Sequence, residues 1–421
     1  MSRVRTFDSW IRFRDYRFLW IGNFCAHGAQ WLQLLTVGWL VRNLTAASGS
    51  SALLVVTAGG LSTLPILLFG PWGGVLGDRL DRRKVVMAIH CFMAAAALTF
   101  ALLVRSGGVE WWHAYAYVIV GGVCWSITFP LRQSLVANTV PRESVVNAYA
   151  TNVFTITGTR ILGPFIGGLL ITTLGFFWNF ALEAALYAGT VLAFLPMKTP
   201  YYQEKAAQEK AAQEKAATEV SSPLASLKEG IRYVWKGERV IFNLITLGII
   251  PNVILHPVLF LLPVFTIQVL HSDADVGGYL LATSGLGGFL SALTIASGGL
   301  LSRRGIVCLG GIAASSISVI LFAQAHWLPA AFFLIGLMSF AQGTFRTTSG
   351  TLIQLVVPDA LRGRVTSLQQ YTQGFLILSS LLIGWFVDLT TVTIGIMTVG
   401  GVGLVLAVFS AATLHRVRRL A

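Results

Sequence analysis

Charge is scarce in this sequence. Only 11% of the 421 residues are Asp, Glu, Lys or Arg, whereas 55% are hydrophobic and the mean hydropathy is +0.72. A soluble protein of this length needs many more charged residues to cover its surface, so a single soluble core is excluded. Most of the chain must therefore lie in lipid, which predicts a polytopic membrane protein.

Cysteine is rare, and the motifs of several enzyme classes are missing. Cys25, Cys91, Cys124 and Cys308 all fall inside apolar runs, so we expect no structural disulfide. The sequence has no phosphate-binding G-x-x-x-x-G-K-S/T loop, no Cys/His metal spacing and no carboxylate pair inside an apolar run. We therefore expect no enzyme activity, no metal, no cofactor and no ATP-driven step.

Long apolar runs dominate instead. Twelve of them reach about 20 residues, the length at which a helix crosses about 30 Å of hydrocarbon. The first lacks a cleavage pattern and is followed by eleven more, so we expect it to be retained. The sequence thus predicts an all-α protein with twelve transmembrane helices, at 18–41, 51–76, 85–104, 112–137, 148–173, 176–196, 240–269, 276–301, 306–325, 328–357, 365–387 and 390–414.

The basic residues are unevenly distributed. Of the 30 Lys and Arg residues, 25 lie in the two tails and the even-numbered connections, whereas only Arg42 and Arg105 lie in odd-numbered connections. The positive-inside rule therefore predicts that both termini are cytoplasmic. The net charge of +13 then reflects topology and contact with membrane lipids, and a nucleic-acid partner is disfavoured.

One long connection divides the chain. We predict an N-terminal six-helix bundle over residues 1–197, a cytoplasmic linker over 198–239 and a C-terminal six-helix bundle over 240–421. The linker contains three tandem QEKAA repeats with Lys and Glu at i, i+4, which is typical of a solvated helical spacer of natural or engineered origin. The amphipathic segment PLASLKEGIRYVWKGERV follows it and is expected on the inner membrane surface.

A cluster of charge follows the second apolar run. The segment GVLGDRLD at 74–81 aligns with GGLLSRRG at 298–305, and each follows the second run of its half, which indicates an internal duplication. The first copy resembles the G-x-L-x-D-R-x-G-R-R signature of the major facilitator superfamily, with Asp81 in place of a glycine. The residues that carry this gating motif are Gly74, Asp78, Arg79, Arg82 and Arg83.

Further segments resemble one branch of that superfamily. FRDYRFLWIGNF at 13–24, RILGPFIGGLL at 160–170 and LIQLVVPDALRGRV at 352–365 are similar to the branch with the enterobactin exporter and related drug-efflux proteins. The resemblance implies two pseudo-symmetric six-helix bundles around a central cavity, with transport by alternating access. It also implies that Asp78 faces the start of helix 11 near Val365 and favours the outward-facing state, although the charges could simply fix topology.

Four ionisable residues lie deep inside predicted helices, where burial is costly and a functional role is the default. They are Arg132, Arg160, Glu183 and Arg346. Arg132 lies roughly 13 Å from the inner end of its run at 1.5 Å per residue, so it can reach Asp78 or contact substrate. Arg346 lies roughly 18 Å from the inner end of its run, near the centre of the bilayer. There it can bind an anionic or catechol-bearing substrate or a helix-end carbonyl.

Proton coupling needs a group that titrates near neutrality. Glu183 is the only acid well inside a run, and burial can raise the pKa of a carboxylate toward neutrality. Two other interpretations stay open: Glu183 pairs with Arg160, or it meets outside water near Gly175. His27 and His256 are alternative proton carriers, and a hydrogen bond between helices is the other interpretation of both.

Polar residues on the first and seventh runs add to a candidate cavity. Gln30 and Gln33 share one helical face, as do Asn252 and His256. The resemblance implies that helices 1, 4, 7 and 10 line the cavity. The predicted substrate cavity therefore contains Gln30, Gln33, Arg132, Asn252 and Arg346.

The fifth run carries a glycine-rich motif. Arg160, Gly163, Pro164, Gly167 and Gly168 resemble a motif associated with exporters of the superfamily. Close packing of helix 5 on a neighbour is the alternative interpretation of its small residues.

These features favour a secondary active transporter. We expect export of a small amphipathic molecule, drug-like or siderophore-like, in exchange for protons, by a multidrug-type monomer in the cytoplasmic membrane. An organic-anion or lipid carrier could use Arg132 and Arg346 without Glu183. A non-transporting membrane receptor or scaffold is the alternative from another class.

Overall fold

The computed structural model describes residues 7–47, 51–69, 80–201, 232, 234–235, 239–298, 304–357, 365 and 372–418. Within these ranges the regular structure is entirely helical. Most of the predicted linker lies outside the described residues, so the predicted domain boundaries stay predictions.

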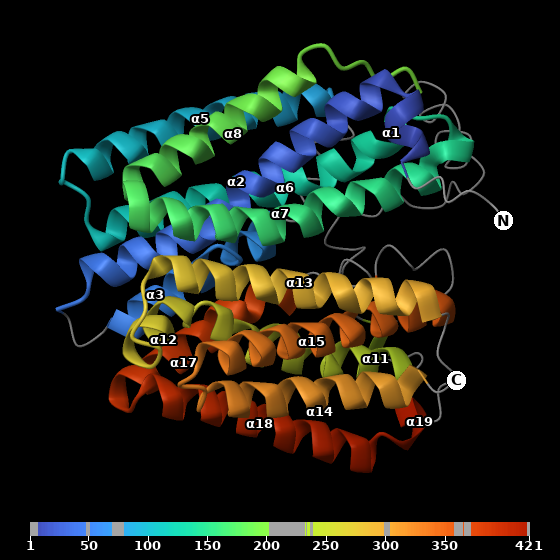
Figure 1. Cartoon of the computed structure of the whole chain (residues 1–421). Coiled ribbons are helices and arrows are strands. Elements are labelled where there is room, and N and C mark those ends of the chain that lie inside the picture. Colours follow the sequence, from blue (N-terminus) through green and yellow to red (C-terminus); the bar gives the residue numbers. More distant parts are fainter. Residues whose placement is uncertain are drawn as a thin grey trace.

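The helices form two groups in chain order, one stacked on the other (Figure 1). After the short helix α1 (Asp8–Arg12), the N bundle contains α2 (Arg14–Leu44), α3 (Ser51–Leu61), α5 (Arg82–Arg105), α6 (Trp111–Asn138), α7 (Val145–Leu174) and α8 (Phe176–Phe194). The C bundle contains α11 (Arg239–Leu247), α12 (Leu262–Gln268), α13 (Ala274–Gly298), α14 (Arg304–Phe322), α15 (Leu328–Val356), α17 (Leu376–Leu389) and α18 (Val392–Thr413), and the short α19 (His415–Arg418) follows.

The first and last described helices, α1 and α19, lie at one end of the bundles, which we name the terminal face (Figure 1). The opposite end, named the distal face, holds the turns between α5 and α6, α7 and α8, and α17 and α18. If the termini are cytoplasmic, as the basic residues predict, the distal face is external.

Eleven helical segments of the described chain are long and apolar enough to cross a membrane. They correspond to the second to twelfth predicted runs. The first run forms α2, which has 31 residues and packs against α7 and α8. Its hydropathy is reduced by Asn23, His27, Gln30 and Gln33, polar residues that fall at the centre of the helix.

The seventh predicted run, 240–269, is not one continuous helix. After α11 the chain forms a π-helical turn at Ile250–Ile254 and a 3-10 turn at His256–Leu259 before α12 begins. Pro251, Pro257 and Pro263 each lack the amide that would continue an α-helix, which accounts for the breaks. Asn252 and His256 therefore do not share the face of one regular α-helix, although both line the cavity described below.

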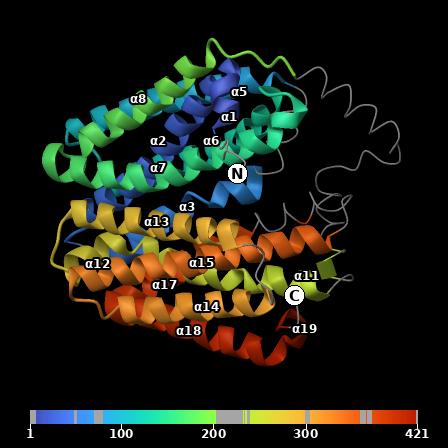
Figure 2. The ribbon, with the colours of Figure 1, turned by 45° about the vertical axis from the view of Figure 1, so that its right-hand side comes forward.

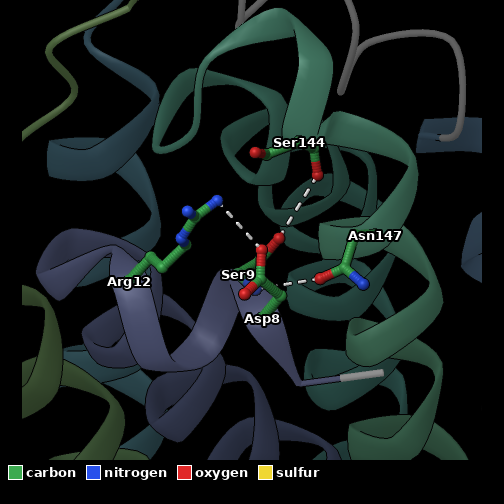
Figure 3. A network of polar contacts seen from close by, with 5 residues as sticks. All are labelled: Asp8, Ser9, Arg12, Ser144 and Asn147. Carbon is green, nitrogen blue, oxygen red and sulfur yellow. Dashed lines mark hydrogen bonds and ion pairs between the residues drawn. The ribbon is translucent and has the colours of Figure 1, made fainter. Parts of the chain in front are cut away.

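The N-terminal segment is fastened to the start of α7 (Figure 3). The Ser9 amide donates to Asn147 Oδ1 at 2.9 Å, the Ser9 hydroxyl donates to the Ser144 carbonyl at 3.3 Å, and Arg12 pairs with Asp8 at 3.2 Å. The contact continues along α2, because three more side chains bond to α7: Tyr16 to the Ala148 carbonyl, Trp20 to the Thr151 carbonyl and Asn23 to Asn152. These bonds fix α2, which carries much of the candidate site.

The most extensive packing between the bundles is that of α7 with α13 and of α3 with α17 (Figures 1 and 2). Small residues allow the close approach, as in membrane helix packing generally. A Cβ built on Gly168 of α7 would lie 2.7 Å from the Ala274 carbonyl oxygen and 3.0 Å from Gly278 Cα. On the other pair, a Cβ on Gly384 of α17 would lie 2.7 Å from Leu53 Cα.

Candidate transport cavity

A cavity of about 540 Å³ lies between the two bundles. Its wall is built from α2, α3, α5, α6, α7 and α8 on one side and from the broken seventh segment, α13, α15 and α17 on the other. The volume suits a small molecule. Because both bundles contribute, a molecule in the cavity would contact both of them.

The described lining is cationic. Arg160 and Arg346 line the cavity, and no Asp, Glu or Lys among the described residues does so. His27, His90 and His256 also reach the wall. A guanidinium in a partly apolar site attracts anions through charge-assisted hydrogen bonds, so this lining favours a ligand with acidic groups.

Arg346 projects from α15 toward the broken seventh segment. Its Nη2 donates to Asn252 Oδ1 at 3.2 Å. The π-helical turn positions Asn252 for this contact, and His256 lines the same cavity, with its ring 5.6 Å from that of Phe260. Arg346 and Asn252, both predicted from the sequence as cavity residues, are thus in direct contact.

Arg160 crosses from the N bundle to the C bundle. Its guanidinium lies 5.3 Å from the Trp31 ring, and its Nη2 donates to Ser284 Oγ of α13 at 3.2 Å. Ser284 in turn accepts a hydrogen bond from Ser339 of α15 at 2.8 Å. The predicted pairing of Arg160 with Glu183 is therefore wrong, because Arg160 projects toward the C bundle.

Aromatic rings form part of the same cavity wall. Trp125 and Phe129 of α6 are stacked with their ring centroids 5.1 Å apart, and the His27 ring meets Trp125 edge-on at 5.3 Å. Trp31 also lines the cavity, as do the predicted residues Gln30 and Gln33. Flat apolar surface beside guanidinium groups is suited to an amphipathic ligand.

Arg132 lies outside the cavity wall. Its side chain is 2% exposed, its guanidinium sits 5.0 Å from the Trp125 ring, and it makes no hydrogen bond to the residues that the structure describes. Its prediction as a cavity residue is not supported by this position. Asp78, its other predicted partner, lies outside the described residues.

Glu183 is buried in the middle of the N bundle. It is 0% exposed, and its Oε1 accepts a hydrogen bond of 2.7 Å from the Tyr117 hydroxyl of α6. The predicted position at a solvated rim near Gly175 is therefore wrong. Tyr187, one helical turn along α8, lines the cavity, whereas Glu183 is not among the lining residues.

The gating motif is only partly described. Gly74, Asp78 and Arg79 lie outside the described residues, so the predicted contact between Asp78 and the start of the eleventh predicted helix, near Val365, stays a prediction. The Arg83 Nε donates to the Phe194 carbonyl at 2.8 Å, and its Nη2 donates to the Leu195 carbonyl. Arg83 therefore provides hydrogen-bond donors for backbone carbonyls at the C-terminal end of α8, which lack partners within the helix.

The departure from the signature at Asp81 has a structural reason. Asp81 is the N-cap of α5, and its side chain accepts hydrogen bonds from the amides of Arg83 and Lys84 at 3.0 and 3.3 Å. A glycine at this position could not make these bonds. Arg82, the remaining member of the motif, begins the helix.

The glycines of the fifth predicted run lie in helix contacts. A Cβ on Gly163 would lie 2.9 Å from Trp31 Cβ, and a Cβ on Gly167 would lie 2.8 Å from the Leu32 side chain, both on α2. Gly168 faces α13 instead, and Pro164 is buried inside α7. This geometry agrees with the packing interpretation of the motif, and the exporter interpretation stays a prediction.

Three residues of the site were not selected from the sequence: His90, Tyr117 and Tyr187. His90 lies inside the predicted helix 85–104, and the rule that selected His27 would have selected it. Its Nδ1 lies 2.7 Å from the Val86 carbonyl oxygen, and its ring lies 5.7 Å from that of Tyr187. No sequence signal distinguishes Tyr117 and Tyr187 from other aromatic residues in lipid-spanning helices.

Comparison with known proteins gives consistent matches over most of the chain. A family model described as transmembrane secretion effector matches residues 8–420. The enterobactin exporter EntS of Shigella flexneri is 24% identical over 349 residues, which cover 81% of this chain and 78% of that protein. The staphyloferrin A transporter of Staphylococcus aureus is 22% identical over 376 residues, which cover 88% and 89% of the two chains.

Solved transporter structures share the fold. A POT family transporter in complex with a thioalcohol-conjugated peptide matches with a TM-score of 0.74 and 11% identity over 96% of both chains. The xylose transporter XylE from E. coli matches with a TM-score of 0.68 and 15% identity over 94% of both chains. The predicted all-α major facilitator fold is thereby confirmed.

Proposed function

The chain belongs to the transmembrane secretion effector family of major facilitator transporters, so it is a multi-pass membrane transporter and not an enzyme; from this premise we propose that it exports a small acidic amphipathic molecule. The observation that carries the proposal is the cavity between the bundles, lined by Arg160, Arg346 and aromatic rings. The names of two relatives, an enterobactin exporter and a staphyloferrin A transporter, support a siderophore-like substrate.

Arg160 and Arg346 come from different bundles, and this supports a role for both in binding. An acidic substrate that contacts both guanidinium groups would reduce the repulsion between two like charges in a low-dielectric site. Its apolar part would pack on Trp31, Trp125 and Phe129. Gln30, Gln33 and Asn252 supply further hydrogen-bonding groups at the wall.

Proton antiport would supply the energy, with Glu183 as the proton carrier. A carboxylate inside an apolar bundle is costly when charged and unpaired, and protonation removes that cost. Glu183 has the Tyr117 hydroxyl as a hydrogen-bond partner, and its Oε2 has no partner among the described residues. His27 and His256, which line the cavity, are the alternative carriers.

The proposed cycle places both termini in the cytoplasm and the distal face outside. Asp78 would hold the terminal face closed in the outward-facing state by contacting the start of the eleventh predicted helix. One chain encloses a complete cavity, so a monomer suffices for this cycle.

The experiment that tests the function is export from cells that lack their own efflux systems. Expression of the protein should lower the cellular content of an acidic amphipathic probe such as 1-naphthoate several-fold, and leave the neutral 1-naphthamide unchanged. The Arg346→Ala variant, expressed to the same level, should abolish the difference. Equal retention of naphthoate with and without the protein would contradict the proposal.

A further inference from the structure

The distal ends of α3 and α17 are joined by a carboxylate that crosses between the bundles. The Ala52 amide donates to Asp388 Oδ1 at 3.0 Å, and the Leu53 amide donates to Asp388 Oδ2 at 2.9 Å. Both amides belong to the first turn of α3, where a helix leaves its backbone donors without internal partners. A side chain of the C bundle therefore caps a helix of the N bundle.

Small residues position this carboxylate. Ser380, Gly384 and Asp388 are spaced by four residues, so they share one face of α17. A Cβ on Gly384 would lie 2.7 Å from Leu53 Cα, and a Cβ on Gly60 of α3 would lie 2.8 Å from Ser380 Cβ. The two backbones are thus in contact along this face, and Asp388 is at its distal end.

We propose that Asp388 is a gating residue that holds the distal face closed through its two hydrogen bonds to the start of α3. When the bundles rock apart at the distal face, both bonds break and all four polar groups must be satisfied by water. The negative charge of Asp388 is also favoured by the partial positive charge at the start of a helix. The contact therefore stabilises the state closed at the distal face relative to the state open there.

This contact mirrors the one that the sequence predicts at the terminal face. There, Asp78 at the end of the second predicted helix is predicted to face the start of the eleventh. Here, Asp388 in the last turn of α17, which belongs to the eleventh, caps the start of α3, which belongs to the second. The same two helices would exchange roles at opposite ends, so a rocking motion would form one contact as it breaks the other. The Asp388 contact rests on described residues alone and does not depend on the Asp78 prediction.

The test measures the distance between the bundles at the distal face, with no substrate present. Spin labels are attached at Thr173→Cys of the N bundle and His326→Cys of the C bundle, both exposed, after the four native cysteines are replaced by serine. Double electron–electron resonance then gives the populations of short and long distances. Asp388→Ala should raise the ratio of long to short distances about fivefold, the effect expected for loss of a helix N-cap.

Two further variants separate the hydrogen bonds from other effects of the substitution. Asp388→Asn keeps one acceptor oxygen and should give a smaller shift. Ala52→Pro removes a donor amide in the first helical turn, where proline is tolerated, and should shift the ratio in the same direction. Combined with Asp388→Ala, it should add little, because both changes remove the same interaction.

A matched control is available on the same face. Glu110 accepts a hydrogen bond of 2.8 Å from Trp112 Nε1 within the N bundle, so Glu110→Ala removes a distal carboxylate that does not bridge the bundles. It should leave the distances unchanged. An Asp388→Ala distribution identical to that of the parent, or a shift equal to that of Glu110→Ala, would overturn the proposal. If Asp388→Ala does not fold, Asp388→Asn and Ala52→Pro decide the question by the same measurement. The result does not bear on the proposed substrate.

Discussion

At the scale of single residues, the two cavity arginines explain why a ligand is expected at all. Arg160 and Arg346 line one cavity, and the described residues place no carboxylate on its wall. Their described hydrogen-bond partners, Ser284 and Asn252, are neutral. Burying positive charge without a counter-charge is unfavourable, so an acidic ligand would gain more here than on an exposed surface.

Substitution of Arg346 should affect acidic ligands selectively. Arg346→Ala should weaken the binding of 1-naphthoate about tenfold or more, because a charge-assisted hydrogen bond is lost, and should change 1-naphthamide binding little. Arg346→Lys should recover only part of the loss, because the planar fork of the guanidinium is absent. Kd values from titration of the purified protein provide the measurement. Arg105→Ala, which removes a distal arginine beside Phe177, is the matched control. Equal losses of affinity for both ligands would indicate that Arg346 has a structural role.

Glu183→Gln tests energy coupling. Glutamine keeps the shape and can still accept a hydrogen bond from Tyr117, but it cannot exchange a proton. We expect proton-driven uphill transport in liposomes to be abolished, while substrate binding and downhill exchange persist. If the variant still concentrates substrate under a pH gradient alone, Glu183 is not the carrier, and His27 and His256 become the residues to test.

The sequence predicted which residues are unusual better than which residues they contact. Arg346, Asn252, Gln30 and Gln33 were selected because polar groups in lipid-spanning helices are costly, and all four reach the cavity wall. The partner of Glu183 was not predicted, because it depends on the rotation of each helix about its axis. That rotation is set by packing between helices distant in sequence, such as α6 with α8 at Tyr117.

At the scale of elements, α7 links the two bundles. Its glycines face α2 on one side and α13 on the other, so one helix carries both contacts. The hydrophobic effect contributes little to the association of helices in lipid, so van der Waals contact at these closely packed positions stabilises the helix pairs instead.

Adding a methyl group to this contact should destabilise the protein. Gly168→Ala would place its Cβ 2.7 Å from the Ala274 carbonyl oxygen, so the helices must separate. We expect a loss of about 1–3 kcal/mol, typical of overpacking, and a lower midpoint of thermal unfolding in detergent. Gly401→Ala is the matched control, because no atom lies within 4 Å of its added Cβ, and the midpoint should stay the same or rise. A Gly168→Ala midpoint no lower than that of Gly401→Ala would contradict the packing account.

Helix positions followed from apolar run length, but irregularities did not. The predicted run 112–137 became α6 at Trp111–Asn138, and 176–196 became α8 at Phe176–Phe194. The broken seventh segment was missed, although its prolines are visible in the sequence. Pro130 and Pro164 lie inside continuous helices, so proline alone does not decide whether a lipid-spanning helix breaks.

At the scale of the whole molecule, transport requires that the two faces open in turn. At the distal face, the Asp388 side chain bridges the bundles by hydrogen bonds to the start of α3. The gating motif predicts a second contact at the terminal face. Each contact would stabilise one of the two states. Removing the contact at the distal face should therefore shift the equilibrium between the states in one direction, and removing the contact at the terminal face should shift it in the other.

Asp78→Asn should therefore have the opposite effect to Asp388→Ala. Loss of the predicted contact at the terminal face should favour the state closed at the distal face and sharply reduce transport, while the protein still folds and inserts. The spin-label pair at Thr173→Cys and His326→Cys should report fewer long distances. Accessibility of an introduced cysteine from outside should fall as well. Unchanged distances together with unchanged transport would remove Asp78 from the gating account.

We propose that this protein moves an acidic amphipathic molecule uphill at the expense of a proton gradient. The most direct measurement uses purified protein in liposomes with an acidic interior, and follows uptake of enterobactin, staphyloferrin A and 1-naphthoate against protein-free liposomes. We predict that at least one probe that binds in an Arg346-dependent way accumulates inside above its external concentration, and that a protonophore or Glu183→Gln prevents this. Accumulation that never exceeds the external concentration, for any probe that binds, would contradict the account.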